Sequence, residues 1–289
     1  MSSNNLPQLK SALSADSIQK KFQEMLGKKS AGFLTSITNV VQNNDLLQKA
    51  EVNSIILAAA QAASLDLPIN PNLGFAAIIP FNDRKSGKCV AQFQIQRDGW
   101  VDLCLRTGQF EYIANEIVYE GELVERNRFT DTYVFDESKR TSNKIVGYMA
   151  SFKLINGYRK TIFMSVEEAK AHGMQYSQTF KKGYGLWKDN FNAMALKTVL
   201  KMLLKKFAPK SIESITQAIE KDQASFVGDI DNAQAVYVDN QKEDKERGEV
   251  TDFEEVEEVD VETGEVKQKT PQVEEKKEDT NNNNNDLEF

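Results

Sequence analysis

The chain has 289 residues, of which 40% are hydrophobic and 27% charged. This is long enough to bury a core without disulfide or metal staples, and no apolar run approaches the ~18 residues of a transmembrane helix. Two cysteines exclude a disulfide scaffold and suit a reducing cytoplasm, and the polar residues 1–10 do not resemble a secretory signal.

Charge divides the chain into two parts. Residues 1–225 carry 29 Lys and Arg against 22 Asp and Glu, whereas residues 226–289 carry 7 against 21. A basic body favours a polyanionic partner, and an acidic segment repels one. From about Asp239 onward large apolar side chains are sparse, so burial does not offset the entropy of ordering. We therefore predict a core over residues 1–225 and an acidic, mostly disordered tail over residues 226–289.

The N-terminal region, residues 1–67, has helical periodicity. Three helices are expected: one through Ile18, Phe22 and Met25 up to Gly27, one over residues 33–41, and one over residues 46–65. Asn44 or Asp45 is the expected cap of the third helix, and Pro68 ends it.

The middle region, residues 75–164, changes to the two-residue period of strands. We expect strands over residues 75–81, 88–97, 110–119 and 133–135, and a helix over residues 98–107 with Asp98 as its N-cap. Asn156-Gly157 then predicts a hairpin between residues 144–155 and 158–164. A two-residue loop places Lys153 opposite Lys160, so either a bound phosphate bridges them or both side chains turn into water.

The region over residues 165–222 returns to helices. Ser165 and Glu168 form a capping-box motif, and Gly173 is the expected end of that helix. A polar loop then leads to a long helix over residues 186–207, which Pro209 ends and which is the last ordered element expected. Helices, antiparallel strands and helices in this order predict an α+β fold: one core domain in which helices pack on a small antiparallel sheet.

Lysines dominate the last predicted helix. Eight lysines and one acid, Asp189, lie between Phe180 and Lys210. Lys197, Lys201 and Lys205 repeat every four residues, which is typical either of a solvated helix face or of a track that contacts phosphates; the density of the cluster favours the track. Gln92, Gln94 and Gln96 share one strand face, which is either merely polar or able to bind bases and sugars.

No motif indicates catalysis. The chain lacks a Walker A motif, and its single histidine, His172, lies near a helix end where a surface position is expected. We expect no catalytic residue, no metal site and no cofactor, with Mg²⁺ at most modulating the activity.

Four separated segments resemble the RecT branch of the RecT/Red-beta family of phage single-strand annealing proteins. They are INPNLGFAAIIPF (69–81), QFQIQRDGWVDLCLRTGQ (92–109), the Asn-Gly hairpin, and the segment from Leu186-Trp187 through MALKTVLKMLLKKFAP (194–209). The chain departs from the family pattern at two places. Arg97 and Asp98 stand where the family often has Gly-Tyr or Tyr-Arg, and Leu186 stands where proline is usual. The resemblance implies binding of single-stranded DNA, assembly into rings or helical filaments, and annealing without ATP in the cytoplasm of a bacterial host. It also implies, through the tail, a phage exonuclease and the host single-strand-binding protein as partners.

The combined prediction is an annealing protein, not an enzyme, that binds single-stranded DNA and the annealed duplex intermediate by the backbone, with no membrane partner. A metal-dependent nuclease and a self-assembling structural phage protein are the alternatives. The acidic tail either competes with DNA or keeps the protein soluble. The predicted DNA-binding residues are Gln94, Gln96, Arg97, Lys144, Lys153, Arg159, Lys160, Lys181, Lys182, Trp187, Lys188, Lys197, Lys201 and Lys205.

Overall fold

The computed structural model describes residues 4–82, 87–127 and 129–236, so only residues 226–236 of the predicted tail are described. The fold class is α+β, as predicted. The α-helices are α1 (Leu6–Leu13), α2 (Asp16–Leu26), α3 (Ser30–Gln42), α4 (Val52–Ser64), α5 (Arg97–Arg106), α6 (Val166–Tyr176), α7 (Gln178–Lys181), α8 (Leu186–Asp189), α9 (Phe191–Phe207) and α10 (Glu213–Lys221). The strands are β1 (Ala76–Asn82), β2 (Cys89–Ile95), β3 (Phe110–Tyr119), β4 (Leu123–Asn127), β5 (Thr132–Phe135), β6 (Ile145–Leu154), β7 (Arg159–Ser165), β8 (Ser225–Val227) and β9 (Gln234–Val236).

The strands form three antiparallel sheets rather than the one small sheet expected. Their orders are β1-β2-β8-β9, β3-β6-β7 and β4-β5. The first sheet therefore joins strands from the middle of the chain to a C-terminal pair that the sequence analysis did not anticipate. Strand β8 begins at the predicted boundary at residue 225 and β9 lies beyond it. The boundary itself stays a prediction.

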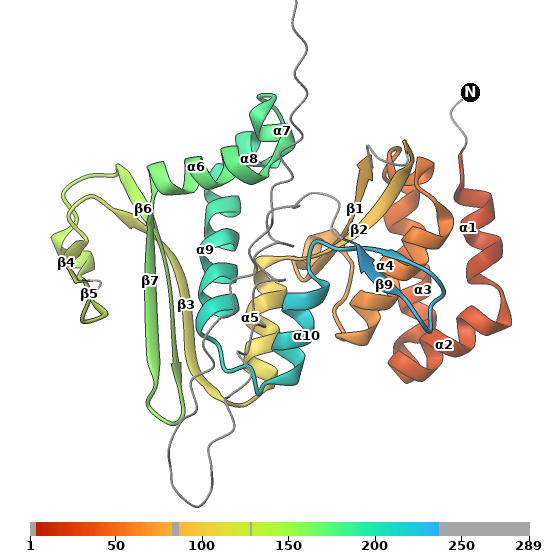
Figure 1. The fold of residues 1–289 in the computed structure, drawn as a ribbon, viewed down its shortest axis with the longest axis horizontal. Coiled ribbons are helices and arrows are strands. Elements are labelled where there is room, and N and C mark those ends of the chain that lie inside the picture. The colour runs from red at the N-terminus through yellow and green to blue at the C-terminus, as the bar shows by residue number, and fades with distance from the viewer. Residues whose placement is uncertain (1–3, 83–86, 128, 237–289) are drawn as a thin grey trace, which may run out of the picture. The chain divides into compact units, whose positions relative to one another are not determined.

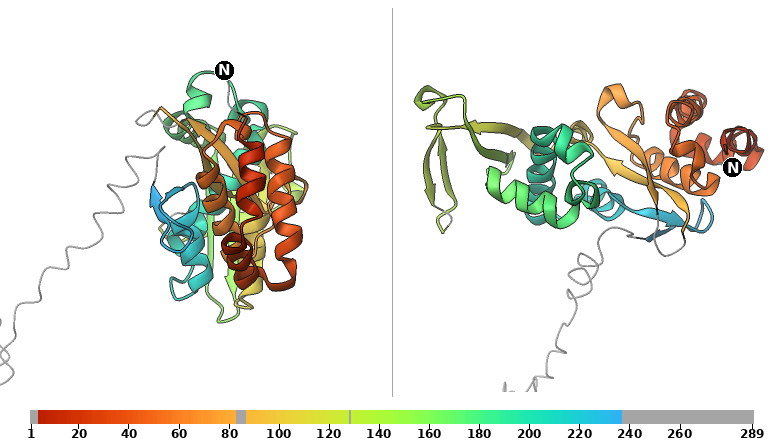
Figure 2. Two further views of the ribbon diagram at one scale, coloured as in Figure 1. Left: turned by 90° about the vertical axis from the view of Figure 1, so that its right-hand side faces the viewer. Right: turned by 90° about the horizontal axis from the view of Figure 1, so that it is seen from above.

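Helices cover the sheets on several sides. The N-terminal helices α1 to α4 pack together beside the first sheet, with α4 against β1 and β2 (Figures 1 and 2). Helix α4 contributes a continuous buried run from Ser54 to Ala60. On β2, Ala91, Phe93 and Ile95 are fully buried, as their two-residue period predicted. Helix α9 lies between the β3-β6-β7 sheet and α5, so it is covered from both sides (Figure 1).

Two helix starts differ from the predictions. The side chain of Asn44 does accept backbone hydrogen bonds, from Leu46 and Leu47, but the element that follows is a 3-10 turn over Leu47–Lys49 with Leu46 as its N-cap. Helix α4 begins only at Val52, because the Glu51 N–H first donates to the Cys89 carbonyl of β2. The N-cap of α5 is Gln96 rather than Asp98, since the Gln96 N–H still pairs with the Phe75 carbonyl.

The C-terminal helices also differ in extent. The capping box of Ser165 and Glu168 is present, but α6 continues past Gly173 to Tyr176. A Cβ on Gly173 would lie 2.8 Å from the Trp187 ring. The role of this glycine is therefore to leave room for the Trp187 side chain, and it does not end the helix. The predicted helix 186–207 breaks at Asn190, where φ is −140° and ψ is 59°. The predicted polar loop contains α7, and α10 follows Pro209.

Candidate nucleic-acid interface

Helix α9 carries the lysine repeat along a face that is otherwise buried. Ala195, Val199 and Leu203 are fully or almost fully buried, as an amphipathic helix in a core requires. Lys197 is buried on the same helix, with 6% of its surface exposed. The lysine repeat therefore does not form an exposed track along the whole helix.

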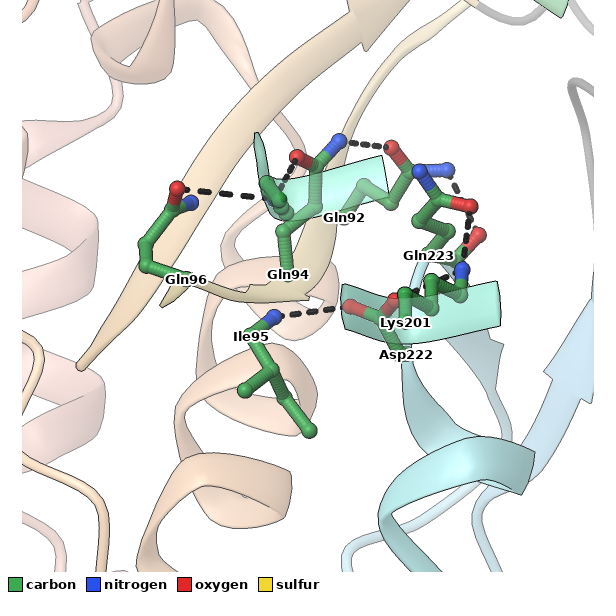
Figure 3. Close-up of polar contacts among 8 residues, drawn as sticks. Gln92, Gln94, Ile95, Gln96, Lys201, Asp222 and Gln223 are labelled. Carbon is green, nitrogen blue, oxygen red and sulfur yellow. Dashed lines mark hydrogen bonds and ion pairs between the residues drawn. The ribbon is translucent and has the colours of Figure 1, made fainter. Parts of the chain in front are cut away.

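A buried polar cluster joins α9 to β2 and to the turn before β8. We define the β2–α9 polar cluster as Gln92, Gln94, Gln96, Lys197, Lys201, Asp222 and Gln223, of which all but Lys197 are labelled in Figure 3. The Gln94 amide donates to Gln92 Oε1 at 2.9 Å, and the Gln92 amide donates to the Gln223 carbonyl at 2.7 Å. Gln92 itself is 1% exposed. The glutamine face of β2 is thus an internal hydrogen-bond network.

Lys197 lies inside this cluster. Its ammonium group donates to Gln94 Oε1 and Gln96 Oε1, each at 3.4 Å. Burial lowers the pKa of Lys197 from 10.5 to about 8; the nearby Asp222 carboxylate opposes this shift and Lys201 adds to it. Two long amide contacts compensate the buried charge only weakly.

Lys201, one turn further along α9, has a stronger partner. Its ammonium group lies 2.7 Å from Asp222 Oδ2 and donates to Gln223 Oε1 at 2.7 Å. The Asp222 carboxylate is buried, and its Oδ1 accepts the Ile95 N–H at 2.7 Å (Figure 3). Burying a carboxylate costs free energy unless it is paired and hydrogen-bonded in this way. The ion pair holds the turn at residues 222–223 against β2 and α9.

Arg97 lies at the first position of α5. Its Nε donates to Asn115 Oδ1 at 3.1 Å, and Asn115 in turn donates to the carbonyls of Met149 and Leu196. Asn115 is buried, whereas 46% of the Arg97 side chain is exposed. This arrangement fixes the guanidinium group beside α9, where its Nη1 also forms an exposed ion pair with Asp98 Oδ1 at 3.6 Å.

Besides Arg97 and Lys201, three predicted cations are paired with acids. Lys144 contacts Glu120 at 3.4 Å and Lys153 contacts Glu111 at 2.8 Å. Hydrogen bonding to Ser142 and the charge of Lys144 lower the pKa of Glu120. Lys160 contacts Asp131 at 2.7 Å, and its ammonium group also lies 4.4 Å from the centre of the Phe207 ring.

The predicted pairing of Lys153 with Lys160 is wrong. Lys153 is opposite Arg159, and Lys160 is opposite Phe152. The hairpin loop has three residues because the Gly157 N–H bonds the Leu154 carbonyl and Gly157 takes a φ of +89°, the left-handed residue of a bulged turn. The one-residue shift places Lys153 and Lys160 on opposite faces, so no single phosphate bridges them.

Near the two ends of α9, several other cations have no acid within 4 Å among the described residues. The α7–α8 lysines are Lys181, Lys182 and Lys188. The α9 C-terminal lysines are Lys205, predicted from sequence, with Lys206 and Lys210, which the prediction left out. Arg159, at the start of β7, is likewise unpaired. A 17-residue helix spans ~25 Å, so α9 separates the two lysine groups.

The Trp187 side chain is packed inside the protein and is not available on the surface to contact DNA. It is 7% exposed and contacts the rings of Phe191, Phe180 and His172 at centroid distances of 5.6, 5.9 and 6.2 Å. By contrast, Tyr184 is 53% exposed in the loop between α7 and α8. An exposed aromatic side chain surrounded by lysines is suited to stack on bases. Tyr184 was missing from the predicted site residues, and the lysines on both sides of it in the sequence are the pattern that could have indicated it.

Comparison with known proteins decides the family. Residues 31–238 match the model of the RecT family. The chain belongs to the RecT family. It is 40% identical over 224 residues to the uncharacterized protein YqaK of Bacillus subtilis (strain 168), covering 78% of this chain and 75% of YqaK. It is 26% identical over 194 residues to Protein RecT of Escherichia coli (strain K12), covering 64% of this chain and 68% of that protein.

RecT family proteins act in DNA recombination, bind single-stranded DNA, oligomerise and anneal single strands, typically in a phage context. The resemblance inferred from the four sequence segments is therefore confirmed. Within the described ranges no helix is long and apolar enough to cross a membrane. The same residues hold no group of three or more His, Cys, Asp or Glu side chains arranged to bind a metal ion.

Proposed function

We propose that this RecT family member anneals complementary DNA strands without ATP and holds each strand by its backbone. The observation that carries the proposal is the set of unpaired cations near the ends of α9, which includes the α7–α8 lysines and the α9 C-terminal lysines. Surface ammonium groups that lack an acid on the protein are available to neutralise phosphates and release counterions.

Annealing requires that the protein bind each DNA strand independently of its sequence. Base pairing itself selects the complementary strand, so Watson–Crick edges must stay accessible while phosphates are neutralised. Arg97 and Tyr184 supplement the lysines, the first as an anchored guanidinium and the second as a stacking surface. Lys197 and Lys201 support this surface from inside by fixing α9 to β2.

The proposed setting is the bacterial cytoplasm during phage recombination. A phage exonuclease would supply the single strand, and the host single-strand-binding protein would occupy it first; the tail over residues 226–289 is the proposed contact for both. We propose that the protein is not an enzyme and uses no cofactor, with Mg²⁺ only modulating its activity.

A fluorescence-quench annealing assay tests the proposal. Two complementary oligonucleotides are mixed in sequence with the protein at several salt concentrations, without ATP or Mg²⁺. We expect pairing to accelerate and the acceleration to weaken as salt rises. Strands that bind but do not pair would make the protein a passive binder, and cleavage of labelled DNA on adding Mg²⁺ would indicate a nuclease instead.

A further inference from the structure

Strand β1 is an open edge of the first sheet. It pairs only with β2 among the described strands. The Gln96 N–H donates to the Phe75 carbonyl, so alternation along the antiparallel ladder directs the main-chain groups of Ala76 and Ile78 away from β2. No described residue hydrogen-bonds to these outward groups. An edge of this kind accepts an additional strand.

A groove of about 520 Å³ runs beside this edge. One wall is a face of α3, another is the loop at residues 69–72, and the third is β1 itself. None of its lining side chains is charged, and the polar ones are Ser36, Asn39, Asn43, Asn44, Asn70 and Asn72. The amides of Asn39, Asn43 and Asn72 bond no other described residue. Amides beside unpaired backbone groups suit a neutral, extended polypeptide rather than a phosphate.

The opposite edge of the same sheet is also open. Strand β9, Gln234–Val236, is exposed throughout and carries no charge. The Phe93 N–H donates to the Ala224 carbonyl, so alternation directs Ser225 toward β9 and leaves the main chain of Ala235 on the outer edge. No residue within the described ranges bonds this outer edge of Ala235. The sheet therefore ends in two complementary neutral edges.

We propose that β9 of one copy adds to the β1 edge of the next copy, over the asparagine-lined groove. This inference rests on the proposed function of a RecT family member, since proteins of this family oligomerise, and it names the surfaces that form the contact. Joining different edges is a head-to-tail contact, which repeats into a ring or a filament. Pairing of β1 with itself about a twofold axis would stop at a dimer. Pro80, which alternation also directs outward, has no N–H to donate, so the short strand β9 is proposed to pair with the part of the edge at Ala76 and Ile78.

Two full-length variants block the two edges separately. Ala235→Pro removes the outward N–H of an exposed residue, and Asn39→Lys/Asn43→Lys places two charges in the groove. The controls are Gln234→Ala on β9 and Thr35→Lys/Gln42→Lys, which adds the same charge to exposed positions of α3. Circular dichroism and thermal unfolding verify that each chain is folded.

Sedimentation velocity without DNA measures assembly against protein concentration. We expect each blocked variant to raise the concentration for assembly by at least about tenfold and the controls to match the wild type. When the two blocked variants are mixed, the one intact pair of edges forms a heterodimer that does not grow. Normal assembly of either blocked variant, or no heterodimer on mixing, overturns the proposal. Binding of a short oligonucleotide is measured on the same samples, so loss of assembly with retained DNA binding is distinguished from failure of the proposed function.

Discussion

Lys197 and Lys201 lie one helical turn apart on α9, yet their removal is expected to have opposite consequences. Lowering the Lys197 pKa from 10.5 to about 8 means that burial disfavours its charged form. At ~1.4 kcal/mol per pKa unit, the charge costs the folded state about 3 kcal/mol at neutral pH. Lys197→Met removes that cost but leaves the oxygens of Gln94 and Gln96 without a donor, at about 1–3 kcal/mol in total. The free energy of unfolding should therefore change little or rise.

Lys201→Met, by contrast, should destabilise the protein by about 3–5 kcal/mol, because it leaves the buried Asp222 carboxylate without its cation. Urea unfolding at pH 7 measures both variants. Equal losses for Lys197→Met and Lys201→Met would contradict the assignment of different roles to these two lysines.

The pH dependence gives an independent check on Lys197. Between the folded pKa of about 8 and the unfolded value of 10.5, the unfolded chain binds a proton that the folded chain has released. In the wild type, the contribution of Lys197 to the free energy of unfolding therefore rises by up to ~1.4 kcal/mol per pH unit over this range. Lys197→Met lacks this contribution. Any advantage of the variant at pH 7 should shrink by about 2 kcal/mol at pH 9.5. A difference that stays constant with pH would refute the reasoning.

Three further outcomes follow from the surface and packing. Alanine at all three α7–α8 lysines should weaken single-stranded DNA binding and reduce the salt slope by about 2, as measured by fluorescence anisotropy, whereas alanine at three exposed lysines of the N-terminal helices should not. Trp187→Ala should lower the free energy of unfolding by about 3–5 kcal/mol, as measured by thermal unfolding. Tyr184→Ala should leave stability unchanged and weaken DNA binding. A stable Trp187→Ala variant that binds DNA weakly would contradict the packing of Trp187. Gly157→Ala should cost about 1 kcal/mol in urea unfolding because of its positive φ, and an unchanged stability would argue against the three-residue loop.

Errors in the predicted elements came from contacts distant in sequence. The start of α4 shifted because Glu51 bonds Cys89, and Gly173 stayed inside α6 because Trp187 packs against it. The short strands β8 and β9 lack a periodic apolar pattern of their own. Strand β8 exists because β2 provides a ladder partner for it. Local periodicity does not report such partners.

The sequence by itself determined the α+β class, most helices and strands, the capping box at Ser165, the basic core and the family motifs. These features depend on periodicity, turn chemistry and composition, which act within a few residues. Only the tertiary structure decided which lysines face solvent. Lys188 and Lys197 are alike in sequence, yet Lys197 is buried because Gln94 and Gln96 lie about 100 residues earlier and close over it, with Asp222 nearby. Burial is set by distant segments packing together, and a periodic run of lysines does not encode it.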